Sequence, residues 1–135
     1  MSRVLVFGAD SLVGSDFVET STRPVIAAGR SDPRNLGLEI EEFHNVDLED
    51  SDAVERTVRD SKAGVVVSFA AATDVDAVER ERPRSLAEAG GSAFRLNAQA
   101  PGSMAKATRA TGKFLVVLST DFVFDGTTGP YSELE

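Results

Sequence analysis

The chain of 135 residues is long enough for one compact domain, and its 41% apolar and 27% charged residues exclude a disordered protein. Its 22 acidic and 14 basic residues give a net charge of −8, which argues against binding to nucleic acid or to an anionic membrane surface. The absence of cysteine excludes disulfides and thiolate metal sites, and we expect no metal centre.

Short apolar runs alternate with amphipathic or polar segments along the chain. We expect strands at residues 4–7, 24–28, 39–46, 65–69 and 113–118. Helices are expected at residues 16–22 and 49–61 and within residues 93–111. Residues 79–93, which are rich in arginine and include a proline and two adjacent glycines, indicate the end of a helix followed by a flexible connector.

The alternation of strands and helices predicts the fold class. Strands that are apolar almost throughout are typical of a parallel sheet covered on both faces. Right-handed crossovers then favour a doubly wound, three-layer Rossmann-like sheet of about five strands in the order 3-2-1-4-5. We therefore expect one NAD(P)-binding domain over residues 1–135, with Phe114, Phe122 and Phe124 in its core.

A glycine-containing loop follows the first predicted strand. It reads Gly8-Ala9-Asp10-Ser11-Leu12-Val13-Gly14, which is a Gly-x-x-Gly-x-x-Gly pattern with serine at the middle glycine. Between the first strand and the first helix of such a fold, backbone N–H groups bind a pyrophosphate. We therefore expect Gly8, Asp10, Ser11, Leu12, Val13 and Gly14 to contact a dinucleotide, with Ser11 either hydrogen-bonding a phosphate or crowding it; a plain tight turn is the alternative.

Three residues beyond the next strands are candidates for the adenosine half of the cofactor. Arg30 follows the second predicted strand, where an arginine favours the 2′-phosphate of NADP and an acid would favour NAD. Asp47 and Leu48 end the third predicted strand, where a carboxylate and the backbone can hold an adenine. NADP(H) is therefore the favoured cofactor, and NAD(H) is the alternative.

An ordered set of four motifs carries a family resemblance. The motifs are Val-Val-Val-Ser-Phe-Ala-Ala-Ala-Thr-Asp-Val-Asp at 65–76, Leu-Asn-Ala-Gln-Ala-Pro at 96–101, Ser-Thr-Asp-Phe-Val-Phe-Asp-Gly at 119–126 and Gly-Pro-Tyr at 129–131. Together they resemble the dTDP-4-dehydrorhamnose reductase family of the extended short-chain dehydrogenase/reductase superfamily. The resemblance implies hydride transfer from NADPH or NADH to the C4 keto group of a nucleotide-linked deoxysugar.

The same resemblance implies roles for individual residues. Thr120 matches the catalytic Thr/Ser, whose hydroxyl would hydrogen-bond the substrate carbonyl oxygen, while the tyrosine and lysine that complete the family's site are not in this chain. Asp121 and Phe122 would contact substrate. The positions matched to the cofactor site are Ala70, Ala71, Ala72, Thr73, Asn97 and Ser119.

Departures from the family pattern keep other functions open. Ser11 replaces a glycine, Phe122 stands where the reductases usually have tyrosine, and the connector at 79–93 is long. An NAD(P)-dependent sugar-nucleotide epimerase or dehydratase is one alternative. A nonenzymatic NADP-binding regulatory subunit, such as the β subunit of methionine adenosyltransferase, is another. We interpret Asp74 and Asp76 as negative charges at the start of a helix and not as metal ligands. Asp121 and Asp125 flank a turn, and they either contact substrate or stabilise the turn.

The two ends of the sequence and its charge composition bear on where the protein is found in the cell and on whether the chain is a fragment. No targeting pattern precedes the first strand, so we expect a cytoplasmic protein. The arginine-rich, acidic composition is typical either of a high-salt cytoplasm or of a GC-rich genome. Leu134-Glu135 resembles a cloning remnant, so we expect a truncated, catalytically incomplete piece whose uncovered sheet self-associates into a homo-oligomer.

Overall fold

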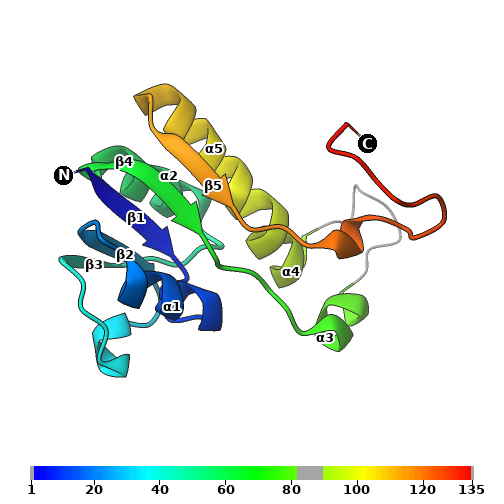
Figure 1. Ribbon diagram of the computed structural model, residues 1–135, viewed down its shortest axis with the longest axis horizontal. Coiled ribbons are helices and arrows are strands. Elements are labelled where there is room, and N and C mark those ends of the chain that lie inside the picture. Colours follow the sequence, from blue (N-terminus) through cyan, green and yellow to red (C-terminus); the bar gives the residue numbers. More distant parts are fainter. Residues whose placement is uncertain (1, 82–89, 135) are drawn as a thin grey trace.

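A five-stranded parallel sheet in the order β3-β2-β1-β4-β5 forms the centre of the molecule (Figure 1). The computed structural model describes residues 2–81 and 90–134. The strands are β1 (Arg3–Phe7), β2 (Val25–Gly29), β3 (Glu42–Asn45), β4 (Ala63–Ser68) and β5 (Phe114–Val117). This topology confirms the predicted doubly wound sheet and its strand order.

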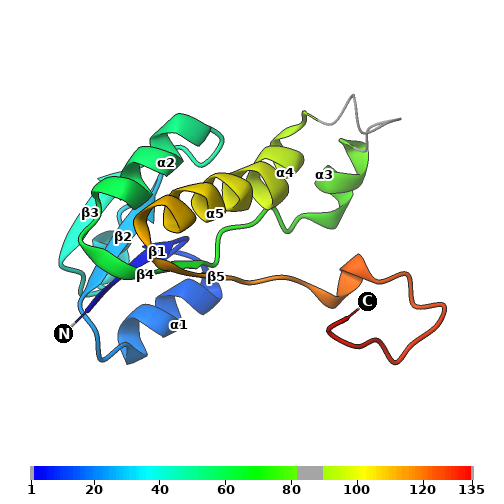
Figure 2. The same cartoon turned by 90° about the horizontal axis from the view of Figure 1, so that it is seen from above.

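Helices cover the two faces of the sheet and give three layers (Figure 2). Helices α2 (Ser51–Asp60) and α5 (Ala100–Thr111) pack on one face, over a core that includes Leu5, Phe7 and Met104. Helix α1 (Leu12–Thr20) packs on the other face, against Val4, Val6 and neighbouring apolar residues of β2. The central strand β1 is buried from Val4 to Phe7 because both faces are covered, which is why its sequence is apolar without alternation.

The remaining elements lie in the connections. They are η1 (Pro33–Leu36), α3 (Val75–Arg80), α4 (Ser92–Phe94), the π-helical turn η3 (Arg95–Gln99) and η4 (Asp121–Val123). Elements α4, η3 and α5 follow one another without a break from residue 92 to residue 111. Beyond β5 the chain leads away from the sheet, so that η4 and the C-terminal residues lie apart from the α/β body (Figures 1 and 2).

Several predicted boundaries were wrong for local reasons. Helix α1 begins at Leu12 and not at residue 16, because the side chain of Ser11 caps it. Strand β3 covers only Glu42–Asn45, since only these residues pair with β2. The helix end predicted at the start of residues 79–93 is confirmed, since α3 ends at Arg80. Residues 82–89 lie outside the described part, and α4 begins at Ser92. The described residues on the two sides of 82–89 are in contact, because the Ala93 amide donates to Glu81 Oε2 at 2.7 Å.

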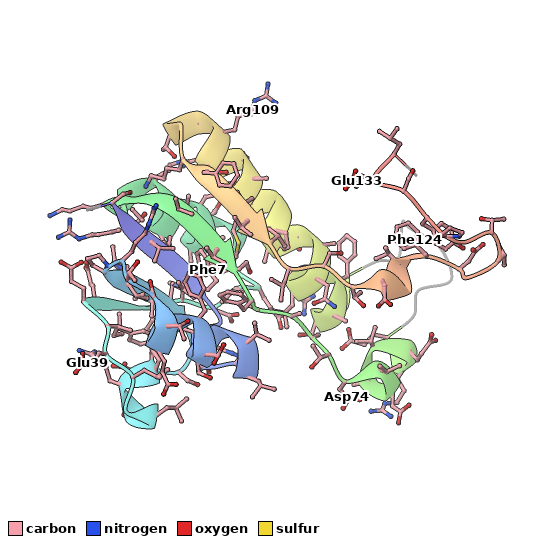
Figure 3. The ribbon with its side chains drawn as sticks, viewed as in Figure 1. Phe7, Glu39, Asp74, Arg109, Phe124 and Glu133 are labelled. Carbon is pink, nitrogen blue, oxygen red and sulfur yellow. The ribbon has the colours of Figure 1, made fainter. Side chains whose placement is uncertain are left out.

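Two of the phenylalanines expected in the core are exposed. Phe114 is 67% exposed because β5 is the last strand of the sheet, and in the described residues one face of β5 has no covering helix (Figure 2). Phe124 is 38% exposed and stacks on Tyr131 with ring centroids 4.4 Å apart (Figure 3). The side chain of Phe122 lies outside the described part. Within residues 2–81 and 90–134, no helix combines the length and the hydropathy needed to cross a bilayer.

Candidate functional site

The carboxyl end of β1 lies at the point where the order of the strands reverses. Strand β2 pairs with one edge of β1 and β4 with the other, so the connections after β1 and β4 leave the sheet on opposite sides. Ligands of doubly wound sheets bind in the crevice outside the strand ends at this point. Gly8 lies there with φ of +76°, and a Cβ atom added to it would sit 2.7 Å from the Ala70 amide nitrogen. The segment after β4 therefore packs directly on the loop after β1.

The predicted phosphate loop is closed by the serine that replaces its middle glycine. Ser11 Oγ donates to the Gly8 carbonyl oxygen at 2.7 Å and accepts from the Gly14 amide at 3.1 Å. A Cβ on Gly14 would lie only 2.0 Å from the Gly8 carbonyl oxygen. Ser11 thus stabilises the loop, and its Oγ already accepts a hydrogen bond from one amide of the first turn of α1, that of Gly14. Leu12 and Val13 lie in the same turn. The first N–H groups of a helix have no carbonyl acceptor within the helix, so the amides of these two residues can bind an anion.

The candidates for the adenosine half lie on the β2–β3 side of the loop. Arg30 directly follows β2 and is exposed. Asp47 is exposed, and its Oδ1 accepts from the Glu49 amide at 3.0 Å. Leu48 is 8% exposed and belongs to the apolar core, so its backbone alone remains available to a ligand.

A charged cluster beside these residues was not predicted from the sequence. Glu49 accepts from Ser92 Oγ and, at 2.7 Å, from Arg95 Nε. These two hydrogen bonds hold the pKa of Glu49 below its ordinary value, with a smaller contribution from the charge of Arg30. The cluster joins the loop after β3 to the segment that begins at α4. The residues in contact are more than forty positions apart, so no local sequence pattern could have predicted them.

The segment after β4 runs from the phosphate loop to the η3 turn. Asn97 binds the backbone of Ala72 twice, since its Oδ1 accepts from the Ala72 amide at 2.7 Å and its Nδ2 donates to the Ala72 carbonyl oxygen at 3.0 Å. Asp74 caps α3 by accepting from the Ala77 amide at 3.0 Å, which confirms its predicted helix-start role (Figure 3). A pocket of about 330 Å³ opens here, lined by Ala72, Thr73, Asp74, Ala77, Val78, Glu81, Ser92 and Ala93.

The residues matched to catalysis and substrate follow β5. The amide of Leu118 donates to the Ser68 carbonyl oxygen at 3.1 Å, which fixes the start of this segment beside the end of β4. Ser119, Thr120 and Asp121 are exposed, and Thr120 Oγ1 lies 3.5 Å from Asp121 Oδ1. The structure thus brings the phosphate loop, residues 70–72 and Asn97 together, while Thr120 lies at the end of a strand two places away from β1.

A second polar cluster orders the turn beyond Thr120. Asp125 Oδ1 accepts from the amide and hydroxyl of Thr127, both at 2.9 Å, and from the Tyr131 hydroxyl at 2.7 Å. These bonds, led by that from the Thr127 amide, hold the pKa of Asp125 below its ordinary value. Asp125 therefore has the turn-stabilising role that the sequence left open.

Comparison with known proteins agrees with this geometry. The model of the family described as RmlD substrate binding domain matches residues 2–135. Methionine adenosyltransferase 2 subunit beta of Pongo abelii is 35% identical over 136 residues, covering 97% of this chain and 36% of the relative. The dTDP-4-dehydrorhamnose reductase of Burkholderia thailandensis is 36% identical over 134 residues, covering 98% of this chain and 39% of the relative.

Solved structures give the same result. A hypothetical dTDP-4-dehydrorhamnose reductase from Sulfolobus tokodaii matches with a TM-score of 0.77 and 29% identity, covering 98% of this chain and 44% of that one. The dTDP-4-dehydrorhamnose reductase of Bacillus anthracis, in complex with NADP, matches with a TM-score of 0.66 and 26% identity, covering 95% of this chain and 40% of that one. The resemblance inferred from the motifs is confirmed, and the chain spans less than half the length of each of these proteins.

Proposed function

The chain belongs to the RmlD substrate binding domain family, and from this we propose that it is the cofactor-binding part of an NADPH-dependent sugar-nucleotide reductase. The observation that carries the proposal is the Gly8–Gly14 loop at the strand-order reversal, where the segment after β4 packs on Gly8. The chemistry of the whole protein would be reduction of the C4 keto group of a nucleotide-linked deoxysugar.

The residues of this chain would divide the binding of NADP(H) between them. The amides at the start of α1 would bind the pyrophosphate, as helix N-termini do. Arg30 would bind the 2′-phosphate, which an exposed guanidinium directly after β2 is suited to do. Asp47 would hold the adenosine, and Ala70 to Thr73 with Ser119 would line the nicotinamide half. The complex of the Bacillus anthracis reductase with NADP supports this choice of cofactor.

Catalysis would need residues beyond those of this chain. NADPH supplies the hydride, and Thr120 would donate a hydrogen bond to the carbonyl oxygen as it becomes an alkoxide. Asp121 and Phe122 would contact the sugar. The only tyrosine is Tyr131, and position 135 after it is glutamate where a Tyr-x-x-x-Lys pair requires lysine. We therefore expect cofactor binding but no turnover from these 135 residues alone.

Titrations of the chain with NADPH and NADH test the cofactor assignment. Arg30→Ala should weaken NADPH binding by about 10- to 100-fold, the equivalent of a lost charge-assisted hydrogen bond, and leave NADH binding within about twofold. Arg109→Ala is the matched control, since Arg109 lies in the last turn of α5, which leads into the start of β5, and is far from Asp74 (Figure 3). Equal NADPH affinity in the Arg30 and Arg109 variants would refute the role of Arg30.

A nonenzymatic NADP-binding subunit is the second candidate. Methionine adenosyltransferase 2 subunit beta is as similar to this chain as the reductase from Burkholderia thailandensis is, at 35% against 36% identity. A longer protein that contains this chain should reduce a dTDP-4-keto sugar with NADPH if the first proposal holds. Binding of NADPH without turnover would favour the second.

We also propose that copies of this chain associate through β5. The outer edge of this strand has no partner in residues 2–81 and 90–134, and Phe114, Val116 and Leu118 are exposed beside it. An unpaired apolar edge favours antiparallel pairing with a second copy about a twofold axis. Light scattering should show a dimer that Val116→Lys converts to a monomer; a monomeric wild type would refute the proposal.

A further inference from the structure

Two arginines flank the carboxylate of Glu49. Arg95 Nε donates to Glu49 Oε2 at 2.7 Å, and Ser92 Oγ donates to Glu49 Oε1. Arg30 acts on the same carboxylate through its charge and contributes to the lowered pKa of Glu49. Both carboxylate oxygens are thus bound by the segment that begins at α4, while Arg30 lies close enough for its charge to be felt.

The backbone explains why Arg30 and Glu49 are neighbours. The Val46 amide donates to the Gly29 carbonyl oxygen at 2.9 Å, so Arg30, directly after Gly29, lies beside the chain as it leaves β3. The Glu49 amide donates to Asp47 Oδ1 at 3.0 Å and closes a tight turn there. This turn fixes the backbone from which the Glu49 side chain extends, on the side of the sheet where the adenosine half would bind.

A carboxylate at this place would work against the proposed binding of NADP. The 2′-phosphate carries nearly two negative charges, and an acid near the adenosine ribose favours NAD. The side chains of Glu49 and Arg95 are 25% and 39% exposed, so water screens their charges only in part. The ion pair with Arg95 therefore offsets a charge that would otherwise attract Arg30 and repel the phosphate.

From these contacts we propose that Arg95 is a positioning residue for cofactor choice, which neutralises Glu49 and so leaves Arg30 available to the 2′-phosphate of NADP. The proposal rests on the proposed function. Arg95 acts from the π-helical turn η3, and its Nη1 also donates to the Gly90 carbonyl oxygen, which holds the guanidinium in place from a second side. Loss of Arg95 should leave the charge of Glu49 uncompensated and should weaken the binding of NADPH but not that of NADH.

Titrations of uncharged variants with NADPH and NADH test this charge balance. Arg95→Gln should weaken NADPH binding about three- to tenfold, the effect of one uncompensated charge at a half-exposed site, and NADH binding by less than about twofold. Glu49→Gln should not weaken NADPH binding, because it removes the charge that Arg95 offsets. The double variant should therefore bind NADPH within about twofold of the wild type. An ion pair with a purely structural role would give no such rescue, since loss of either partner would then weaken both cofactors.

Arg59→Gln is the matched control, because Arg59 also pairs with a glutamate, Glu55, at 2.5 Å, and its side chain is 44% exposed. Arg59 lies in the last turn of α2, and Asp50 caps the opposite end of that helix beside Glu49, so this variant should change neither affinity. Unchanged NADPH binding in Arg95→Gln, equal weakening of both cofactors, or no recovery in the double variant would overturn the inference while leaving the cofactor site in place. A folded wild-type chain that binds neither cofactor would instead overturn the proposed function, and the inference with it.

Discussion

Replacing Gly14 with alanine should lower the stability of the protein, although alanine is the better helix former. Gly14 is the third residue of α1, and its added Cβ would lie 2.0 Å from the Gly8 carbonyl oxygen and 2.8 Å from Ser11 Oγ. The nearest obstacle is backbone, so no change of rotamer can relieve the clash. Either the start of α1 or the Gly8 turn must move.

The size of the effect follows from what that movement disrupts. Overpacking of a fitted site costs about 1–3 kcal/mol. The Gly8 carbonyl oxygen also accepts from Ser11 Oγ at 2.7 Å and from the Ser11 amide at 3.1 Å. Weakening these hydrogen bonds increases the loss of stability by about 1 kcal/mol, and the higher helix propensity of alanine offsets about 1 kcal/mol of that loss. We therefore expect a net loss of about 1–3 kcal/mol in the free energy of unfolding, which is a large part of the stability of a small domain.

Urea denaturation of the protein without ligand measures this loss, with Gly102→Ala as the matched control. Gly102 lies in α5, and apart from its chain neighbours and the nearby backbone of that helix a Cβ there would meet no atom within 4 Å, so the same substitution should stabilise the protein by about 0.5–1 kcal/mol. The two alanine variants should thus shift the urea midpoint in opposite directions. An unchanged or raised midpoint in Gly14→Ala would refute the close approach of α1 to Gly8.

Three further predictions concern contacts outside the phosphate loop. Lys113→Met should lower the free energy of unfolding by about 1–3 kcal/mol, because the ammonium group donates to carbonyl oxygens at the carboxyl end of α2; an unchanged urea midpoint would contradict this. Hydrogen bonding to Lys106 lowers the pKa of Glu55 from 4.5, so its stabilisation is complete above that pH and disappears as the pH falls through the folded pKa. Acid titration should therefore destabilise Glu55→Gln less than the wild type, and parallel curves would count against the ion pair. Tyr131→Phe should raise the pKa of Asp125 but leave it below 3.8, because the larger contribution comes from a backbone amide; carboxyl chemical shifts would show no change if the phenol bond were absent.

The layout of the sheet could be predicted because each strand carries its own signal. Residues 65–67 are three consecutive valines without alternation, which is typical of a strand covered on both faces. The position of Gly8 after the first such strand then locates the ligand crevice, since strand order and crossover hand follow from general rules. These inferences need no contact between distant residues.

What could not be predicted depends on such contacts. Phe114 has the same apolar surroundings in sequence as a core residue, and only its place at the edge of the sheet exposes it. The Asn97–Ala72 pair joins residues 25 positions apart, and the motif indicated that Asn97 matters without saying what it binds. Ser11 was recognised as a departure from the pattern, but its cap on α1 depends on backbone geometry that the sequence does not specify.

Calorimetric titration of the 135-residue chain with NADPH measures directly whether the Gly8–Gly14 loop belongs to a cofactor site. We expect saturable binding of one NADPH per chain, weakened by Arg30→Ala and unaffected by Arg109→Ala. A chain that is folded by circular dichroism and shows no binding at millimolar NADPH would contradict it.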